Sequence, residues 1–260
     1  MSQCSIESTF PAMKRCIIAL LLCLVSLGWT AWAAAVNCPA SSYTLSSQAE
    51  VDAFPADCDG VNGTLLVEGS DITNLDGLAN LTSVGGNVDI RNNDALTNLD
   101  GLANITSVGE LLQIYNNRAL TNLDGLANIT SVGGRLLITT NTALTNLNGL
   151  ANITSLGLAS PLRFGYLRIE RNATLTNLNG LANLTSVGGD LVIFNNATLT
   201  NLNGLANLTS VGGNLTIWDN PALTNLDGLA NLTSVGGNLF IYNNAALTNL
   251  DGLANLTSVG

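Results

Sequence analysis

The chain repeats one unit of 24 residues over most of its length. The unit contains the motif Leu-Thr-Asn-Leu, whose first leucines are Leu96, Leu120, Leu144, Leu175, Leu199, Leu223 and Leu247. The interval is 24 residues except between Leu144 and Leu175, where it is 31. A fixed period of this size is typical of solenoids, in which each unit packs only on its neighbours. The sequence therefore predicts a stack of coils.

The pattern within one unit predicts short strands. The unit is LTNL[DN]GLAN[LI]TSVGGxLxIxNxxA, in which apolar residues alternate over short spans, as in half-buried strands. Asp-Gly, Asn-Gly and Gly-Gly steps separate these spans and indicate tight bends with positive φ. No 3.6-residue helical period is present. We expect about three strands per coil, with neighbouring coils stacked about 4.8 Å apart as parallel sheets.

Two columns of asparagine recur at fixed places in the unit. The first is Asn80, Asn104, Asn128, Asn152, Asn183, Asn207, Asn231 and Asn255. The second is Asn93, Asn117, Asn141, Asn172, Asn196, Asn220 and Asn244. Both are expected to point inward at corners, where an amide can bond its own coil and the next asparagine. The first column lies in N-[LI]-T glycosylation motifs, which an inward position would exclude, so Asn62 and Asn214 are the better-placed acceptors.

The N-terminus has the features of a signal peptide over residues 1–33. Met13, Lys14 and Arg15 precede an apolar run at 16–29, and Ala31-Trp32-Ala33 fits a cleavage site. The run is shorter than the roughly 20 residues of a membrane-spanning helix, and no second candidate follows. The sequence predicts a secreted or cell-surface protein, or one in the periplasm or on the outer surface of a bacterium. An uncleaved leader that anchors the chain is the alternative.

Residues 34–62 differ from the repeats and are predicted to form an N-terminal cap. Cys38 and Cys58 are the two cysteines that remain after cleavage, and an exported chain favours a disulfide between them over two free thiols. Ser47 and Glu50 form a capping box for a short helix that ends before Pro55. The repeat solenoid follows at 63–260 with about eight coils. It contains a seven-residue insertion at 158–164, and its last unit is expected to be truncated.

These motifs resemble the receptor L-domain family. The resemblance covers roughly residues 38–260 and rests on the repeated unit and on the cysteine-bounded segment that contains SSQAEVDAF. It implies an all-β fold, a right-handed parallel β-helix or leucine-rich-repeat-like solenoid of about 24-residue coils with a small disulfide-pinned cap. Its members include ligand-binding lobes of receptors and fungal GPI-anchored cell-wall proteins. The resemblance therefore implies extracellular binding or wall architecture without enzymatic activity.

The composition argues against several function classes. The chain has no histidine, and its one lysine, Lys14, lies in the leader, which removes most general bases and nucleophiles near pH 7. We therefore predict no enzyme and no cofactor. The net charge of −10 leaves no basic patch for a nucleic acid, so none is expected as a partner.

One acidic column keeps a calcium site or a polysaccharide-cleaving enzyme open as minor alternatives. Its members are Asp76, Asp100, Asp124, Asn148, Asn179, Asn203, Asp227 and Asp251. Stacked carboxylates could call for a cation such as calcium. Asparagine replaces aspartate in three consecutive coils, which favours a turn position over a shared metal site. We therefore predict no metal ligands.

The outward positions of one strand per coil are the ones that vary. From them we predict a binding surface for a protein or glycan, with candidate residues Arg91, Tyr115, Arg168, Phe194, Trp218, Phe240 and Tyr242. An exposed aromatic strip on a soluble protein marks an interaction site. The alternatives are that the aromatic residues only stabilise the sheet, or that the chain is a structural cell-surface or cell-wall spacer. Ice binding by the threonine columns, represented by Thr97 and Thr82, is a further minor alternative.

Overall fold

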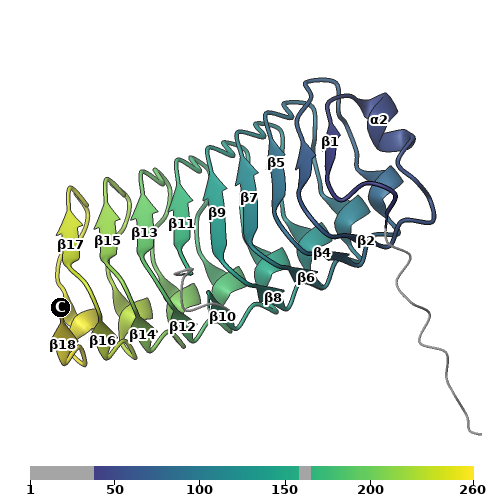
Figure 1. Cartoon of the computed structure of the whole chain (residues 1–260). Helices are drawn as coiled ribbons and strands as arrows, with labels where there is room; N and C mark the ends of the chain where they lie inside the picture. The colour runs from purple at the N-terminus through teal and green to yellow at the C-terminus, as the bar shows by residue number, and fades with distance from the viewer. Residues whose placement is uncertain (1–37, 158–164) are drawn as a thin grey trace, which may run out of the picture. The chain divides into compact units, whose positions relative to one another are not determined.

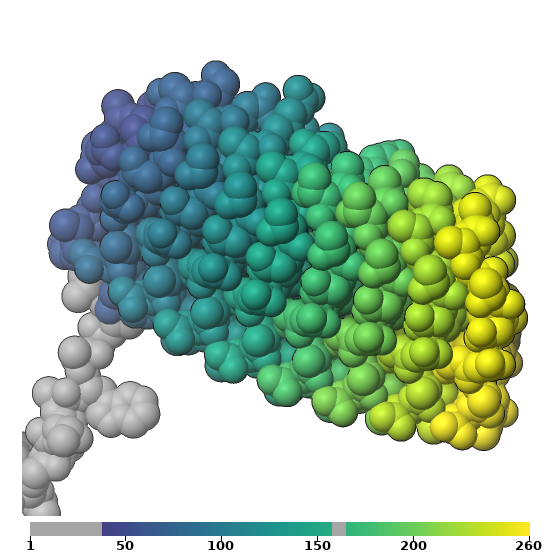
Figure 2. Space-filling view, turned by 180° about the vertical axis from the view of Figure 1, so that it is seen from behind, coloured from purple at the N-terminus to yellow at the C-terminus, as the bar shows by residue number. Residues whose placement is uncertain are grey.

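The protein is an all-β solenoid of parallel coils, as the repeat predicts (Figure 1). The computed structural model describes residues 38–157 and 165–260, which belong to one compact unit. The signal peptide predicted for 1–33, the first residues of the predicted cap and the insertion at 158–164 lie outside these residues. In the space-filling view, successive coils form bands that follow one another along the stack (Figure 2).

Strands from the described residues form two parallel sheets of nine strands each. We call the first the long sheet; its strands are β1 (Tyr43–Leu45), β3 (Leu65–Val67), β5 (Val88–Arg91), β7 (Leu111–Tyr115), β9 (Arg135–Thr139), β11 (Leu167–Glu170), β13 (Leu191–Phe194), β15 (Leu215–Trp218) and β17 (Leu239–Tyr242). The second is the short sheet; its strands are β2 (Gly60–Val61), β4 (Ser83–Val84), β6 (Ser107–Val108), β8 (Ser131–Val132), β10 (Ser155–Leu156), β12 (Ser186–Val187), β14 (Ser210–Val211), β16 (Ser234–Val235) and β18 (Ser258–Val259). Equivalent residues of neighbouring coils pair in register.

Each coil contains two strands and a 3₁₀ turn, so the prediction of three strands per coil is wrong. The turns are η1 (Asp76–Leu78), η2 (Asp100–Leu102), η3 (Asp124–Leu126), η4 (Asn148–Leu150), η5 (Asn179–Leu181), η6 (Asn203–Leu205), η7 (Asp227–Leu229) and η8 (Asp251–Leu253). Leu75, Leu78 and Leu81 of the first repeat are buried at intervals of three residues. This spacing matches the 3.0 residues per turn of a 3₁₀ helix, which places all three leucines in the core.

The glycines of these turns permit close packing of coils rather than positive φ. Among the described residues, Gly157 alone of the glycines has positive φ, which contradicts the expected role of the Asp-Gly and Gly-Gly steps. A Cβ atom on Gly101 would instead overlap the carbonyl oxygen of Leu75 in the preceding coil. The left-handed positions are occupied by Asn92, Asn116, Thr140, Arg171, Asn195, Asp219 and Asn243. Each is the residue that directly precedes an asparagine of the second column.

The second asparagine column forms the predicted ladder and is buried except at its last member, Asn244. Asn117 donates from its backbone N to Oδ1 of Asn141 at 3.0 Å and from Nδ2 to the carbonyl oxygen of Ile90 at 2.9 Å. Its side chain is fully buried, as is that of Asn141. Each asparagine therefore bonds both neighbouring coils and satisfies backbone groups that the corner would leave unpaired.

The first asparagine column is exposed, so its predicted inward orientation is wrong. Because the inward leucines of the turn are three residues apart, Ala79 and Asn80 between them face outward. The Nδ2 of Asn104 donates to the carbonyl oxygen of Ala79 at 2.8 Å, and the other members make the same bond to the preceding coil. Burial therefore does not exclude glycosylation of this column. Of the two acceptors expected instead, Asn62 is exposed and Asn214 is partly buried.

The N-terminal segment continues both sheets and covers the first repeat. Strand β1 pairs with β3 and β2 pairs with β4, and between them lies α2 (Gln48–Asp52). The Ser47 side chain accepts a hydrogen bond from the Glu50 N–H, which confirms the predicted N-cap. The Glu50 carboxylate accepts from Ser46, and these hydrogen bonds lower the pKa of Glu50.

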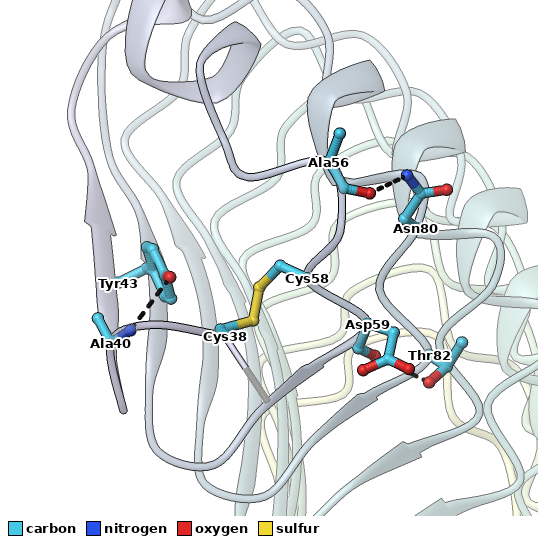
Figure 3. Close-up of a disulfide and its surroundings, with 8 residues drawn as sticks. All are labelled: Cys38, Ala40, Tyr43, Ala56, Cys58, Asp59, Asn80 and Thr82. Atoms are coloured by element: carbon cyan, nitrogen blue, oxygen red, sulfur yellow. Dashed lines mark hydrogen bonds between the residues drawn. A yellow bond between two sulfur atoms is a disulfide. The ribbon is translucent and has the colours of Figure 1, made fainter. Parts of the chain in front are cut away.

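The predicted disulfide between Cys38 and Cys58 is present (Figure 3). Around it, Asn80 donates from Nδ2 to the carbonyl oxygen of Ala56 at 2.7 Å, and Thr82 donates from Oγ1 to that of Asp59 at 2.8 Å. Ala56, inside the loop closed by the disulfide, and Asp59, directly after it, thus both accept hydrogen bonds from the first full repeat.

Candidate binding surface

Sequence variation is concentrated on the outer side of the long sheet. Three columns of outward residues run across its strands, and we call them together the variable face. The first column is Asn87, Leu111, Arg135, Tyr166, Asp190, Asn214 and Asn238. The middle column is Asp89, Gln113, Leu137, Arg168, Val192, Thr216 and Phe240. The last column is Arg91, Tyr115, Thr139, Glu170, Phe194, Trp218 and Tyr242.

The short sheet shows no comparable variation. Its strands all consist of Ser-Val, except that β2 is Gly60–Val61 and β10 is Ser155–Leu156. Both sheets are built from the same coils, so the backbone does not explain why the outward side chains differ between coils in the long sheet only. The variable face is therefore the surface on which the coils differ from one another.

At the N-terminal end of the variable face, Arg91 is held by two carboxylates. Its guanidinium lies 2.9 Å from Glu68 Oε2 and 3.2 Å from Asp89 Oδ2. Hydrogen bonds from Asn92 and Arg91 lower the pKa of Glu68. Burial raises the pKa of Asp89, although Arg91 and the amide of Gln113 oppose this shift. Arg91 is thus already paired within the chain.

Toward the other end, three aromatic rings of the last column stack on one another. The ring centroids of Phe194 and Trp218 are 3.7 Å apart, and those of Trp218 and Tyr242 are 5.3 Å apart. We call these three residues the aromatic stack. The guanidinium of Arg171 lies 5.2 Å from the Phe194 centroid. Stacking of this kind stabilises neighbouring strands by about 0.2–1 kcal/mol per pair.

The stack only partly matches the predicted exposed strip. Phe240 and Tyr242 are 47% and 45% exposed, and Tyr115, farther along the column, is 39% exposed. Trp218 is half-buried, and Phe194 is only 8% exposed, so the prediction of an exposed Phe194 is wrong. Neighbouring groups cover both faces of the Phe194 ring, and a ligand reaching the stack would contact mainly its edges.

A hollow of about 760 Å³ lies on the variable face, along residues of the first and middle columns. Its lining side chains are Arg135, Leu137, Tyr166, Arg168, Asp190 and Asn214, together with the glycines Gly189, Gly212, Gly213 and Gly237. The surface is low over the glycines, which have no side chains, and the long side chains next to them form the walls of a recess. Its volume lies within the range of about 300–1,000 Å³ that is common for small-ligand sites.

Hydrogen bonds within the sheet orient the polar groups of the hollow. Asp190 Oδ1 accepts from the backbone N of Asn214 at 2.7 Å, and Asn214 Oδ1 accepts from that of Asn238 at 2.8 Å. Burial is the main cause of a raised pKa for Tyr166, which keeps its phenol a neutral hydrogen-bond donor. The hollow is therefore built of groups whose positions the coil spacing determines.

The two arginines of the hollow differ in their partners. Arg168 Nε lies 3.1 Å from Glu170 Oε2, an ion pair that lacks the geometry of a hydrogen bond, and its guanidinium lies 5.7 Å from the Tyr166 ring centroid. Arg135 is exposed, and within residues 38–157 and 165–260 no carboxylate lies within ion-pair distance of it. Within the described residues, Arg135 is thus an exposed cation without a carboxylate partner.

Comparison with known families gives a match over part of the repeats. A sequence model of the receptor L domain matches residues 82–164. Residues 82–164 are therefore similar to the receptor L domain family. The same unit continues on both sides of the matched segment, in the same two sheets. No curated protein matches the chain. Receptor L domains are extracellular ligand-binding modules, so the match supports a binding module at the cell exterior and names no partner.

The candidate residues predicted from the sequence fall into three groups in the structure. Arg91 and Tyr115 lie at one end of the variable face, Arg168 lies in the hollow, and the aromatic residues lie at the other end. Of the residues that line the hollow, only Arg168 was predicted from the sequence to bind a ligand. Arg135 and Tyr166 were not, because the hollow depends on the glycine corners of neighbouring coils, and only the assembled coils show this arrangement.

Two further properties concern metals and membranes. In the described part of the chain, no three His, Cys, Asp or Glu side chains are grouped as metal ligands. The aspartates of the Asp76 column are exposed, and each begins a 3₁₀ turn. No helix within the described residues is long and apolar enough to cross a membrane.

Proposed function

We propose that this protein binds a protein or glycan at the cell exterior through its variable face. The observation that carries the proposal is the contrast between the two sheets: the long sheet changes its outward residues from coil to coil, whereas the short sheet repeats Ser-Val. The proposal includes no catalysis, no cofactor, no metal and no nucleic acid. The candidate residues Tyr115, Trp218, Phe240 and Tyr242 would supply apolar contact, and Arg91 and Arg168 polar contact.

Substitution of exposed aromatic residues tests the proposal, because exposed side chains contribute little to the folded core. In a triple variant, Tyr115→Ala, Phe240→Ala and Tyr242→Ala, the lost contacts should weaken binding about tenfold or more, because aromatic anchors dominate binding energy. Wild type and variant would be compared on a glycan array and by titration with purified surface proteins. The triple variant Thr121→Ala, Thr145→Ala and Thr200→Ala changes exposed residues away from the variable face and should bind as wild type. Equal binding by both variants would argue against the variable face.

A structural spacer is the second candidate, and the aromatic stack favours it. The rings of Phe194, Trp218 and Tyr242 stack on one another, and Phe194 is buried there, which is expected of side chains that stabilise neighbouring strands. A spacer predicts that the aromatic substitutions lower the melting temperature and leave surface attachment unchanged.

A further inference from the structure

The hollow on the variable face has a chemical character different from that of the aromatic stack. It contains two guanidinium groups, one carboxylate, one amide and one phenol, and Leu137 is its one large apolar side chain. The anchors of a high-affinity protein partner lie in well-packed pockets that exclude water. The lining instead suits a ligand that is rich in both hydrogen-bond donors and acceptors.

The arginine distribution indicates a negative charge on the ligand. The chain is acidic, with 18 Asp and Glu against 8 Lys and Arg. Among the described arginines, Arg91, Arg118, Arg168 and Arg171 each have an acidic partner. Arg135 has none there, although it lies exposed at the rim of a recess. A guanidinium recognises a carboxylate through two parallel hydrogen bonds.

The neighbouring groups of the first column suit hydroxyl groups. Tyr166 lies in the coil after Arg135, and Asp190 in the coil after that, since Leu136 bonds Tyr166 and Leu167 bonds Asp190. Asp190 uses Oδ1 in the sheet and retains Oδ2 as an acceptor. Asn214, in the next coil, retains its Nδ2 donor on the same side of the sheet. Coils repeat about every 4.8 Å, so Tyr166, Asp190 and Asn214 follow one another along the hollow at about that spacing.

We propose that the hollow binds a saccharide that carries a carboxylate group, such as a short run of uronic acid units. The carboxylate pairs with Arg135, and a sugar ring lies against Tyr166. Hydroxyl groups bond Asp190 and Asn214. This inference rests on the proposed binding function of the variable face and names the class of ligand for one part of it.

Titration calorimetry with defined trisaccharides tests the proposal. The probes are trimers of galacturonate, guluronate and glucuronate, with a neutral galactose trimer and triglutamate for comparison. At least one uronate trimer should bind wild type, and more tightly than the other two probes. Arg135→Gln should weaken that binding about tenfold or more, since hydrogen bonds to charged groups are among the stronger ones. Arg118→Gln removes the same charge from an exposed arginine outside the hollow and should change nothing.

Several results would overturn the proposal for the hollow without rejecting binding by the rest of the variable face. If no uronate trimer binds, or if Arg135→Gln and Arg118→Gln have equal effects, the hollow is not an acidic-saccharide site. Tighter binding of triglutamate would assign it to a peptide. In each of these cases, loss of another ligand on substitution of Tyr115, Phe240 and Tyr242 would leave the variable face as a binding surface. Circular dichroism of the Arg135→Gln protein verifies that it folds.

Discussion

Seven residues at the ends of long-sheet strands adopt a left-handed backbone, and Thr140 suits that conformation least. Its φ is 60°, whereas four equivalent positions are asparagine and one is aspartate. Asparagine visits this region at low cost because its short polar side chain can bond locally, but a β-branched side chain is strained there. Asn116, in the preceding coil, also donates from Nδ2 to the side chain of Asn92 at 2.7 Å, and Thr140 carries no amide to make the equivalent bond.

Thr140→Asn should therefore stabilise the protein. We expect the free energy of unfolding to rise by about 1 kcal/mol. The coil imposes a left-handed backbone at residue 140, and asparagine adopts that backbone with less strain than threonine. Urea unfolding followed by circular dichroism would measure the gain. Thr145→Asn, an exposed threonine without positive φ, is the control and should change the free energy little. A gain no larger than that of the control would show that Thr140 is not strained.

At this scale, the sequence predicts some orientations and not others. The inward position of Asn93 and its equivalents was expected of a repeated asparagine at a corner. Strand alternation after Val88 and Ile90 would instead turn Asn93 outward, and the left-handed backbone of Asn92 breaks that alternation. The outward position of Asn80 was not expected, because it depends on a 3₁₀ turn that alternation does not indicate. Phe194 was predicted to be exposed because its strand position faces outward. Its burial comes from Arg171 and Trp218, whose contact with it depends on packing between coils.

The elements are joined by bonds between coils, and the buried asparagines are central to these. Asn141 accepts from the backbone N of Asn117 and donates from Nδ2 to the carbonyl oxygens of Ile114 and Thr139. Removing this side chain would leave polar groups of two coils unpaired in the core. An unpaired buried polar group costs about 1–3 kcal/mol.

Asn141→Ala should destabilise the protein by about 3 kcal/mol or more, as several of these groups lose their partners together. Asn128→Ala is a matched control, since Asn128 makes a single exposed bond to the carbonyl oxygen of Ala103. It should cost about 1 kcal/mol or less. Thermal and urea unfolding of both variants would measure the difference. Equal losses would mean that the buried ladder contributes no more than the exposed bonds.

The element pattern was predictable in part from the repeat. The period of 24 residues and the alternating apolar residues predicted parallel coils and the long-sheet strands. The 3₁₀ turns were missed because the leucine spacing of three residues matches neither strand alternation nor an α-helix. The hollow could not be predicted, because it arises where Arg135 and Tyr166 stand beside the glycines of other coils, a juxtaposition across coils rather than along the chain.

Across the whole molecule, the two ends of the stack differ in protection. At the N-terminal end, α2 and the segment around Cys38–Cys58 cover the first repeat, and Val51 and Phe54 are buried there. At the other end of the described residues, Leu250 and Val259 are 54% and 49% exposed. In a solenoid each coil is stabilised by its neighbours, so a coil with one neighbour opens more readily.

Hydrogen exchange of this 260-residue chain should show that difference. Amides of residues 247–260 should exchange fastest among the repeats, because their coil contacts one neighbour and buries less apolar surface. Mass spectrometry of peptides from successive coils would measure the rates. Protection there equal to that of the central coils would contradict the prediction.

The N-terminal coil provides the internal control. Closing a loop of about 20 residues with a disulfide is worth on the order of 3 kcal/mol. Reduction of Cys38–Cys58 should therefore speed exchange most around 65–72 and leave residues 247–260 unchanged.

The aromatic stack has a spectroscopic consequence. Trp29 and Trp32 lie within the predicted signal peptide, so a chain cleaved near Ala33 carries one tryptophan, Trp218. Its indole lies between the rings of Phe194 and Tyr242 on the variable face. Intrinsic fluorescence of the mature protein therefore reports one known place. A shift in its emission maximum when ligand is added would locate the change on that face, without any attached dye.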